Sequence, residues 1–213
     1  AFMKYCNAKI VTLNPYVLPA ESKRIKGFRN FKEDTLKHFG MCYVEKMPFD
    51  KTDGTQSELR NRLGVPIYFK EETVGYAFRR VNENDIPKWL FQPAGLDKKN
   101  LLYNYQDSWH EEVILCEGMF DVWAWEECGK HANAVLGSSI SDEQIELLTR
   151  VTTTLILSFD GDEAGIIATQ KAIDKLKYKF DLKVVCFDKG KDPNDYDTQS
   201  LLELYDKKVH YLR

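Results

Sequence analysis

The sequence lacks several features that would place it outside the cell or in a membrane. No apolar run approaches the length of a membrane span, and no basic segment followed by an apolar run marks a signal peptide. The five cysteines lie far apart and form no CxxC pair, which argues against a zinc site and against a disulfide framework. We therefore expect a protein that stays inside a cell and has no membrane partner.

The chain of 213 residues is 43% hydrophobic and 30% charged, which is typical of globular proteins. Its net charge of −3 is unevenly distributed, because residues 1–110 carry +5 and residues 111–213 carry −8. This division favours a polyanionic partner for the first part and metal-binding carboxylates for the second. Two solvated surfaces would give the same charges, and charge alone favours that simpler interpretation.

The first part of the chain shows few regular patterns. Glu33 to Phe39 predicts a short helix that Gly40 ends. Two short apolar runs, 65–69 and 74–78, flank a polar turn and predict a β-hairpin. Arg79 and Lys88 lie beside aromatic residues, which suits phosphate contact and base stacking on a single strand. The alternative is a hairpin whose aromatic side chains face the core.

After residue 111 short apolar runs alternate with helical patterns. Strands are predicted at 113–116, 132–136, 154–159 and 183–187, with helices between them. This alternation indicates βαβ units and a mainly parallel sheet. We place the boundary between the two parts near residue 110.

Acidic residues follow three of the predicted strands, where ligands bind in open α/β sheets. They are Glu117 after the first strand, Asp160 and Asp162 after the third, and Asp188 and Asp192 after the fourth. Carboxylates gathered at one sheet edge repel one another unless a cation lies among them, and hard oxygen ligands suit Mg²⁺ or Mn²⁺. Each acid also has an ordinary alternative role as a helix N-terminal residue.

The order of the motifs resembles the TOPRIM domain of bacterial-type, DnaG-like DNA primases. Upstream, Phe39-Gly40, Arg79 and the segment 87–90 look like the basic subdomain that precedes TOPRIM in that family, so the resemblance covers roughly residues 31–197. The TOPRIM motifs are Glu117-Gly118-x-x-Asp121, Leu136-Gly137-Ser138-Ser139, Asp160-Gly161-Asp162-x-Ala164-Gly165 and Lys191-Asp192-Pro193-Asn194-Asp195.

The resemblance implies an α/β fold: a TOPRIM-type mainly parallel sheet with flanking helices over residues 111–213. A smaller mixed α+β basic subdomain over residues 1–110 would precede it and bind template and nucleotide. The implied activity is template-directed synthesis of short RNA primers on single-stranded DNA from ribonucleoside triphosphates, by nucleotidyl transfer that depends on Mg²⁺ or Mn²⁺. A replicative helicase is the implied protein partner, and the cytoplasm of a bacterium or a phage-infected host the implied location.

The resemblance also assigns roles to residues. Glu117, Asp160 and Asp162 would be catalytic, and Arg79 and Lys88 would contact nucleotide phosphates or the template. The implied metal ligands are Glu117, Asp121, Asp160, Asp162 and Asp192.

Two departures accompany the resemblance. Asn194 stands where many family members have a second acid, and the zinc-binding module that precedes this region in many relatives is missing from the sequence. We expect the catalytic core of a longer primase, with a phage-encoded enzyme as one origin. The alternatives are a TOPRIM-type metal-dependent nuclease and a non-catalytic module that binds single-stranded nucleic acid.

Overall fold

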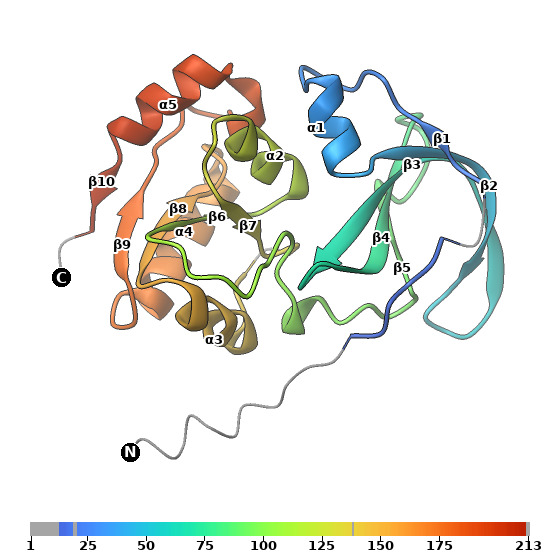
Figure 1. Ribbon diagram of the computed structural model, residues 1–213, viewed down its shortest axis with the longest axis horizontal. Coiled ribbons are helices and arrows are strands. Elements are labelled where there is room, and N and C mark those ends of the chain that lie inside the picture. The colour runs from blue at the N-terminus through green and yellow to red at the C-terminus, as the bar shows by residue number, and fades with distance from the viewer. Residues whose placement is uncertain (1–12, 19–20, 138, 212–213) are drawn as a thin grey trace, which may run out of the picture.

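An antiparallel sheet and a mainly parallel sheet lie side by side in the computed structural model, which describes residues 13–18, 21–137 and 139–211 (Figure 1). The antiparallel sheet has the strand order β1-β2-β3-β4-β5. Its elements are β1 (Lys23–Arg24), β2 (Cys42–Asp50), β3 (Gln56–Phe69), β4 (Glu72–Arg80) and β5 (Trp89–Gln92), with helix α1 (Glu33–His38) between β1 and β2.

The predicted hairpin is the centre of this sheet. Its turn consists of Lys70 and Glu71, which both have left-handed backbone angles, with φ of 52° and 68°. A two-residue hairpin turn with positive φ at both positions has a twist that matches the right-handed twist of the strands that it connects. Strand β3 is longer than the predicted run because its first half pairs with β2, which has no clear apolar alternation in the sequence.

The second sheet confirms the predicted α/β fold. Its strands β6, β7, β8 and β9 are parallel, and β10 pairs antiparallel with β9 in the order β10-β9-β8-β6-β7. The strands are β6 (Val113–Cys116), β7 (Ala132–Ala134), β8 (Thr154–Ser158), β9 (Asp181–Val184) and β10 (Val209–His210). The helices are α2 (Met119–Glu127), α3 (Asp142–Val151), α4 (Glu163–Leu176) and α5 (Thr198–Asp206), with short 3-10 turns η2 (Lys98–Asn100) and η3 (Pro193–Asp195).

One predicted strand is displaced along the sequence. The apolar run 183–187 predicted the fourth strand, but β9 starts at Asp181, because the parallel register with β8 pairs Asp181 with Thr154. The chain leaves the sheet after Val184, so the predicted strand end moves toward the N-terminus.

The two sheets share one hydrophobic core. Buried side chains from α1, from parts of β3 and β4 and from the strands and helices of the parallel sheet belong to one large cluster. A second, smaller cluster within the antiparallel part consists of Cys42, Val44, Met47, Leu59 and Phe78. The segment 101–105 joins the two parts: the Tyr103 N–H donates to the Ala134 carbonyl at 2.9 Å, and the Lys70 N–H donates to the Tyr105 carbonyl at 3.1 Å. The domain boundary near residue 110 follows this segment and stays a prediction.

Helix α2 packs deeply between the parallel sheet and α1. Trp123 and Trp125 are both fully buried, and their indole N–H groups donate to the Tyr103 hydroxyl and the Ser158 hydroxyl, each at 2.8 Å. Burying both rings with their polar atoms bonded anchors the helix whose N-terminus faces the candidate site. Within the described part of the chain, no helix has the length and apolar character needed to cross a membrane.

Candidate active site

The acidic loops at the carboxyl ends of β6 and β8 converge with the loop 188–192. The Gly161 N–H donates to the Lys191 carbonyl at 2.8 Å, and the Gly190 N–H donates to the Gly161 carbonyl at 3.0 Å. A Cβ atom at Gly161 would lie 2.3 Å from the Asp188 carbonyl oxygen, so only glycine allows this approach. The glycine between the two aspartates therefore brings the loop of Asp160 and Asp162 against the loop of Asp192.

Helix capping, the ordinary alternative for these acids, occurs in the structure. Asp162 is the N-cap of α4, and one of its oxygens accepts the Gly165 N–H at 2.8 Å. Asp192 caps the short turn η3 by accepting the Asn194 N–H at 3.0 Å. Each bond uses Oδ1 and leaves Oδ2 of the same carboxylate for another ligand.

The acids of the converging loops raise one another's pKa values. Partial burial, followed by the charges of Glu117, Asp192 and Asp162, raises the pKa of Asp160 to about 7. Burial and the charge of Asp162 raise the pKa of Glu117, whose Oε1 is buried without a hydrogen-bond partner. Burial and the charge of Asp195 raise the pKa of Asp192. These acids form a site of concentrated negative charge that is costly without a cation.

Asp121 occupies a different position from the other acids. It is only 6% exposed, and both of its oxygens accept hydrogen bonds: Oδ2 from the Gly118 N–H at 3.1 Å and Oδ1 from the Asn194 side-chain amide at 2.8 Å. Burial, followed by the charges of Asp160 and Asp192, raises its pKa well above the ordinary value. Asp121 thus ties the start of α2 to the turn that carries Asp192.

The donor set fits a divalent cation in its chemistry. Among the residues that the structure describes, no three carboxylate, histidine or cysteine side chains are grouped as the ligands of one ion. The Oε1 atom of Glu117, buried without a hydrogen-bond partner, is nevertheless an unsatisfied oxygen in this acidic cluster. Rotation of these side chains would offer oxygen atoms to an ion such as Mg²⁺, which keeps part of its water shell.

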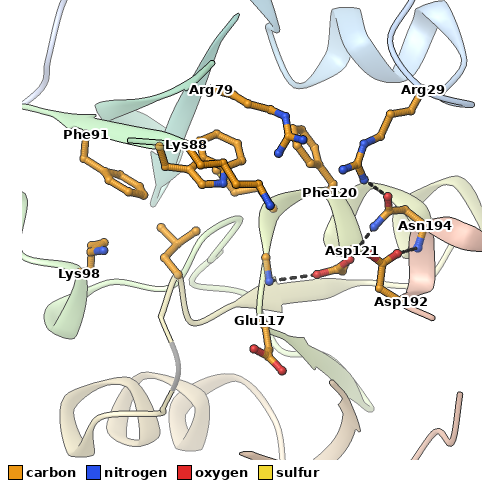
Figure 2. Close-up of a pocket in the computed structure, with 14 residues that line it drawn as sticks. Arg29, Arg79, Lys88, Phe91, Lys98, Glu117, Phe120, Asp121, Asp192 and Asn194 are labelled. Carbon is orange, nitrogen blue, oxygen red and sulfur yellow. Dashed lines mark hydrogen bonds between the residues drawn. The ribbon is translucent and has the colours of Figure 1, made fainter. Parts of the chain in front are cut away.

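A pocket of about 330 Å³ lies where the acidic loops face the antiparallel sheet. Glu117, Asp121 and Asp192 line one side, and Arg79 and Lys88 extend toward it from the other (Figure 2). Arg79 lies on β4 opposite Trp89, and Lys88 lies directly before β5, so both residues come from neighbouring positions at the edge of the pocket. Asp160 and Asp162 lie outside the lining of this pocket.

Further residues line the pocket that were not assigned a role from the sequence, among them Arg29, Lys98, Phe120 and Asn194. Phe120 is the centre of an aromatic floor, with the guanidinium groups of Arg29 and Arg79 at 5.0 and 5.7 Å from its ring centroid. Lys98 lies over the ring of Phe91 at 4.3 Å. Arg29 could have been found from the basic character of the stretch around it, and Asn194 from its place in the last TOPRIM motif. No sequence signal pointed to Lys98.

The aromatic residues near Arg79 divide between core and pocket. Phe78 is fully buried and stacks on Tyr76 at 5.9 Å, so the core interpretation holds for Phe78. Trp89 is half-buried and lines the pocket, with Arg79 at 5.5 Å over its ring. Only Trp89 of these three is placed to meet a ligand in the pocket.

Comparisons with known proteins show which family the chain resembles. Residues 114–197 match the Toprim-like protein family. The DNA primase of Listeria monocytogenes is 31% identical over 188 residues, covering 77% of this chain and 30% of the relative. The DNA primase of Borreliella burgdorferi is 37% identical over 177 residues, covering 78% of this chain and 32% of the relative. The chain thus spans about a third of the length of the curated relatives it matches.

Solved structures show the same fold. The zinc-binding and RNA polymerase domains of the Aquifex aeolicus primase align with a TM-score of 0.72 at 21% identity, covering 86% of this chain and 54% of that one. A DnaG primase catalytic domain bound to single-stranded DNA aligns with a TM-score of 0.70 at 22% identity, covering 85% of this chain and 69% of that one.

The parallel sheet with acids at its strand ends, preceded by a basic antiparallel sheet, defines a TOPRIM-type α/β protein. Within that class, the predicted resemblance to the catalytic core of DnaG-like DNA primases is confirmed in both sequence and fold. A phage origin stays a prediction.

Proposed function

We propose that this chain is the RNA polymerase core of a DNA primase, which synthesises short RNA primers on a single-stranded DNA template. The observation that carries the proposal is the pocket in which Glu117 and Asp192 face Arg79 and Lys88. Nucleotidyl transfer needs both kinds of residue at one place, because metal-binding acids act on the reacting groups while cations bind the triphosphate. The relatives named DNA primase, and the similar catalytic domain bound to single-stranded DNA, support the same function.

Mg²⁺ or Mn²⁺ would be held by Glu117, Asp160, Asp162 and Asp192, with Asp121 close by. When bound, the ion neutralises charge on the phosphoryl oxygens and lowers the pKa of the attacking hydroxyl. The unpartnered Oε1 of Glu117 supports a second role for that residue. We assign Oε1 as the atom that accepts the proton of the attacking hydroxyl, because its raised pKa makes the carboxylate a better base.

Arg79 and Lys88 would bind the triphosphate of the incoming ribonucleotide and the phosphates of the template. Burial and the nearby charge of Arg29 lower the pKa of Arg79, so a phosphate group would relieve the repulsion between the two guanidinium groups. The half-buried ring of Trp89 gives a base a surface on which to stack. Together these residues would align the triphosphate with the acidic cluster.

The remaining expectations belong to the same proposal. Residues 1–110 would bind template and nucleotide, and residues 111–213 would carry the metal-dependent chemistry. The protein would act in the cytoplasm of a bacterium or a phage-infected host, beside a replicative helicase.

A single incubation tests the function. The chain is incubated with single-stranded DNA, labelled ribonucleoside triphosphates and Mg²⁺ or Mn²⁺, and the products are separated by size. Short RNA products that require the template are expected. Cleavage of the DNA without added nucleotides would instead identify a TOPRIM-type nuclease. The incubation is repeated with a purified zinc-binding domain of a related primase. If the chain then binds DNA but catalyses neither reaction, it is a binding module.

A further inference from the structure

A chain of hydrogen bonds connects the N-terminal segment to the buried acid of the pocket. Arg29 Nη1 donates to Asn194 Oδ1, and Asn194 Nδ2 donates to Asp121 Oδ1 at 2.8 Å (Figure 2). The backbone N–H of Asn194 donates to Asp192 Oδ1 at 3.0 Å. The side chain of Asn194 therefore joins a cation to a buried carboxylate, and its backbone N–H bonds a candidate metal ligand.

The amide is suited to this position for a chemical reason. Its oxygen accepts from a cation while its nitrogen donates to a carboxylate, so it satisfies both neighbours at once. A carboxylate there would also bond Arg29, but it would face Asp121 without a donor and place two like charges in contact. Because Asp121 is only 6% exposed, water would screen that repulsion poorly.

Arg29 therefore bonds a neutral amide, and its charge acts on the nearby Asp192 through space. Within the described part of the chain none of the ion pairs at 4.0 Å or less involves Arg29, and its bond to Asn194 uses one of its five N–H groups. Its guanidinium lies over the rings of Phe28 and Phe120 at 5.6 and 5.0 Å, which fixes its direction beside Arg79. The remaining N–H groups are those that a phosphate would accept from.

We propose that Asn194 is a positioning residue that presents Arg29, which forms no direct ion pair within the described part of the chain, to the triphosphate of the nucleotide while it holds the buried Asp121 in place. This inference rests on the proposed nucleotide site. It implies that an uncharged side chain at position 194 favours phosphate binding in this pocket, and that a charged one would favour metal binding.

The test is the isosteric change N194D, with binding measured separately for inorganic tripolyphosphate without metal and for Mn²⁺ without nucleotide. The new carboxylate would pair with Arg29 and add an oxygen ligand beside Asp192. We expect tripolyphosphate affinity to fall about fivefold, the scale of an exposed ion pair, and Mn²⁺ affinity to rise. If Asn194 had a purely structural role, N194D would weaken the binding of both tripolyphosphate and Mn²⁺. A lower affinity for tripolyphosphate together with a higher affinity for Mn²⁺ supports the proposal, and any other pair of changes overturns it.

Two further variants isolate the route through Arg29. In an Arg29→Ala background, N194D should no longer reduce tripolyphosphate affinity, since the cation that it neutralises is gone. An undiminished effect would overturn the proposal. Thr52→Asp adds the same charge at the exposed turn between β2 and β3, and should change neither affinity.

The outcomes also separate this inference from the proposed function. If the wild-type chain binds no tripolyphosphate, the nucleotide site itself fails, before any variant is compared. If N194D does not fold, Asn194→Ala removes both side-chain hydrogen bonds without adding charge. That variant should weaken tripolyphosphate binding about twofold and Mn²⁺ binding less than that, and an equal loss of both would contradict the proposal.

Discussion

Replacing Gly161 by alanine should separate the two acidic loops that form the candidate site. The added Cβ would lie 2.3 Å from the Asp188 carbonyl oxygen and 3.2 Å from the Lys191 carbonyl oxygen, where ordinary contacts begin at 3.4 Å. Both neighbours are backbone atoms, so no side chain can rotate away. The loops must move apart by about 1 Å, since repulsion rises steeply below the contact distance.

The movement would break the two hydrogen bonds between the loops, from the Gly161 N–H to Lys191 and from the Gly190 N–H to Gly161. Their loss costs about 1 kcal/mol each, and the backbone shift adds at least about 1 kcal/mol. A total of about 3 kcal/mol corresponds to a fall in Tm of about 6–12 °C for a chain of this size.

Thermal melting followed by circular dichroism measures the stability, and primer synthesis is measured at a temperature where the variant is folded. We expect synthesis to be lost, because the loop of Asp160 and Asp162 moves away from Asp192. Gly27→Ala is the matched control, since its Cβ would have no atom within 4 Å, and it should melt within about 2 °C of the wild type. A G161A protein that melts like the control and synthesises primers would refute the reasoning.

Three further predictions concern the charged residues. Asp160→Ala should abolish primer synthesis and spare the fold. Asp162→Ala should abolish synthesis too, and should also lose about 1 kcal/mol of stability because the N-cap of α4 is removed. Full activity in either variant would contradict the metal site. Without metal, the free energy of unfolding should fall as the pH rises from about 4 to above 7, because Asp160 ionises near pH 7 in the folded state and near 3.8 in the unfolded state. Added Mg²⁺ should therefore raise Tm more at pH 8 than at pH 5. Equal shifts of Tm at the two pH values would count against a metal site at Asp160. Lys88→Ala should reduce the salt dependence of DNA binding by about one phosphate contact, and an unchanged slope in a titration against salt would exclude that contact.

The strongly patterned elements could be predicted from the sequence. Val113–Cys116 is a continuous apolar run because β6 is buried on both faces between β7 and β8. Serine directly before a helical pattern is a common N-cap, and at the start of α3 the Ser141 hydroxyl accepts the Gln144 N–H at 3.0 Å. The long strand β2 could not be predicted, because its exposed and buried residues do not alternate regularly.

The candidate site divides in the same way. Glu117, Asp160 and Asp192 could be identified because each follows a predicted strand of one parallel sheet, and parallel strands present their carboxyl ends at one edge. Lys98 could not be identified, since its place beside the pocket depends on the packing of the turn 98–100 against α3. Asp121 was predicted as a metal ligand, and the structure adds that both of its oxygens already bond to protein donors.

The sequence by itself determined which strand ends carry acids and which segments carry bases, because these follow from residue types and their spacing along the chain. It also determined the parallel sheet, since apolar periodicity is a local property. Only the tertiary structure decided that Arg29, 165 positions away along the chain, bonds to Asn194, and that the basic and acidic residues face the same pocket. Contacts between distant segments depend on how two sheets pack on a shared core, which no local pattern of residues records.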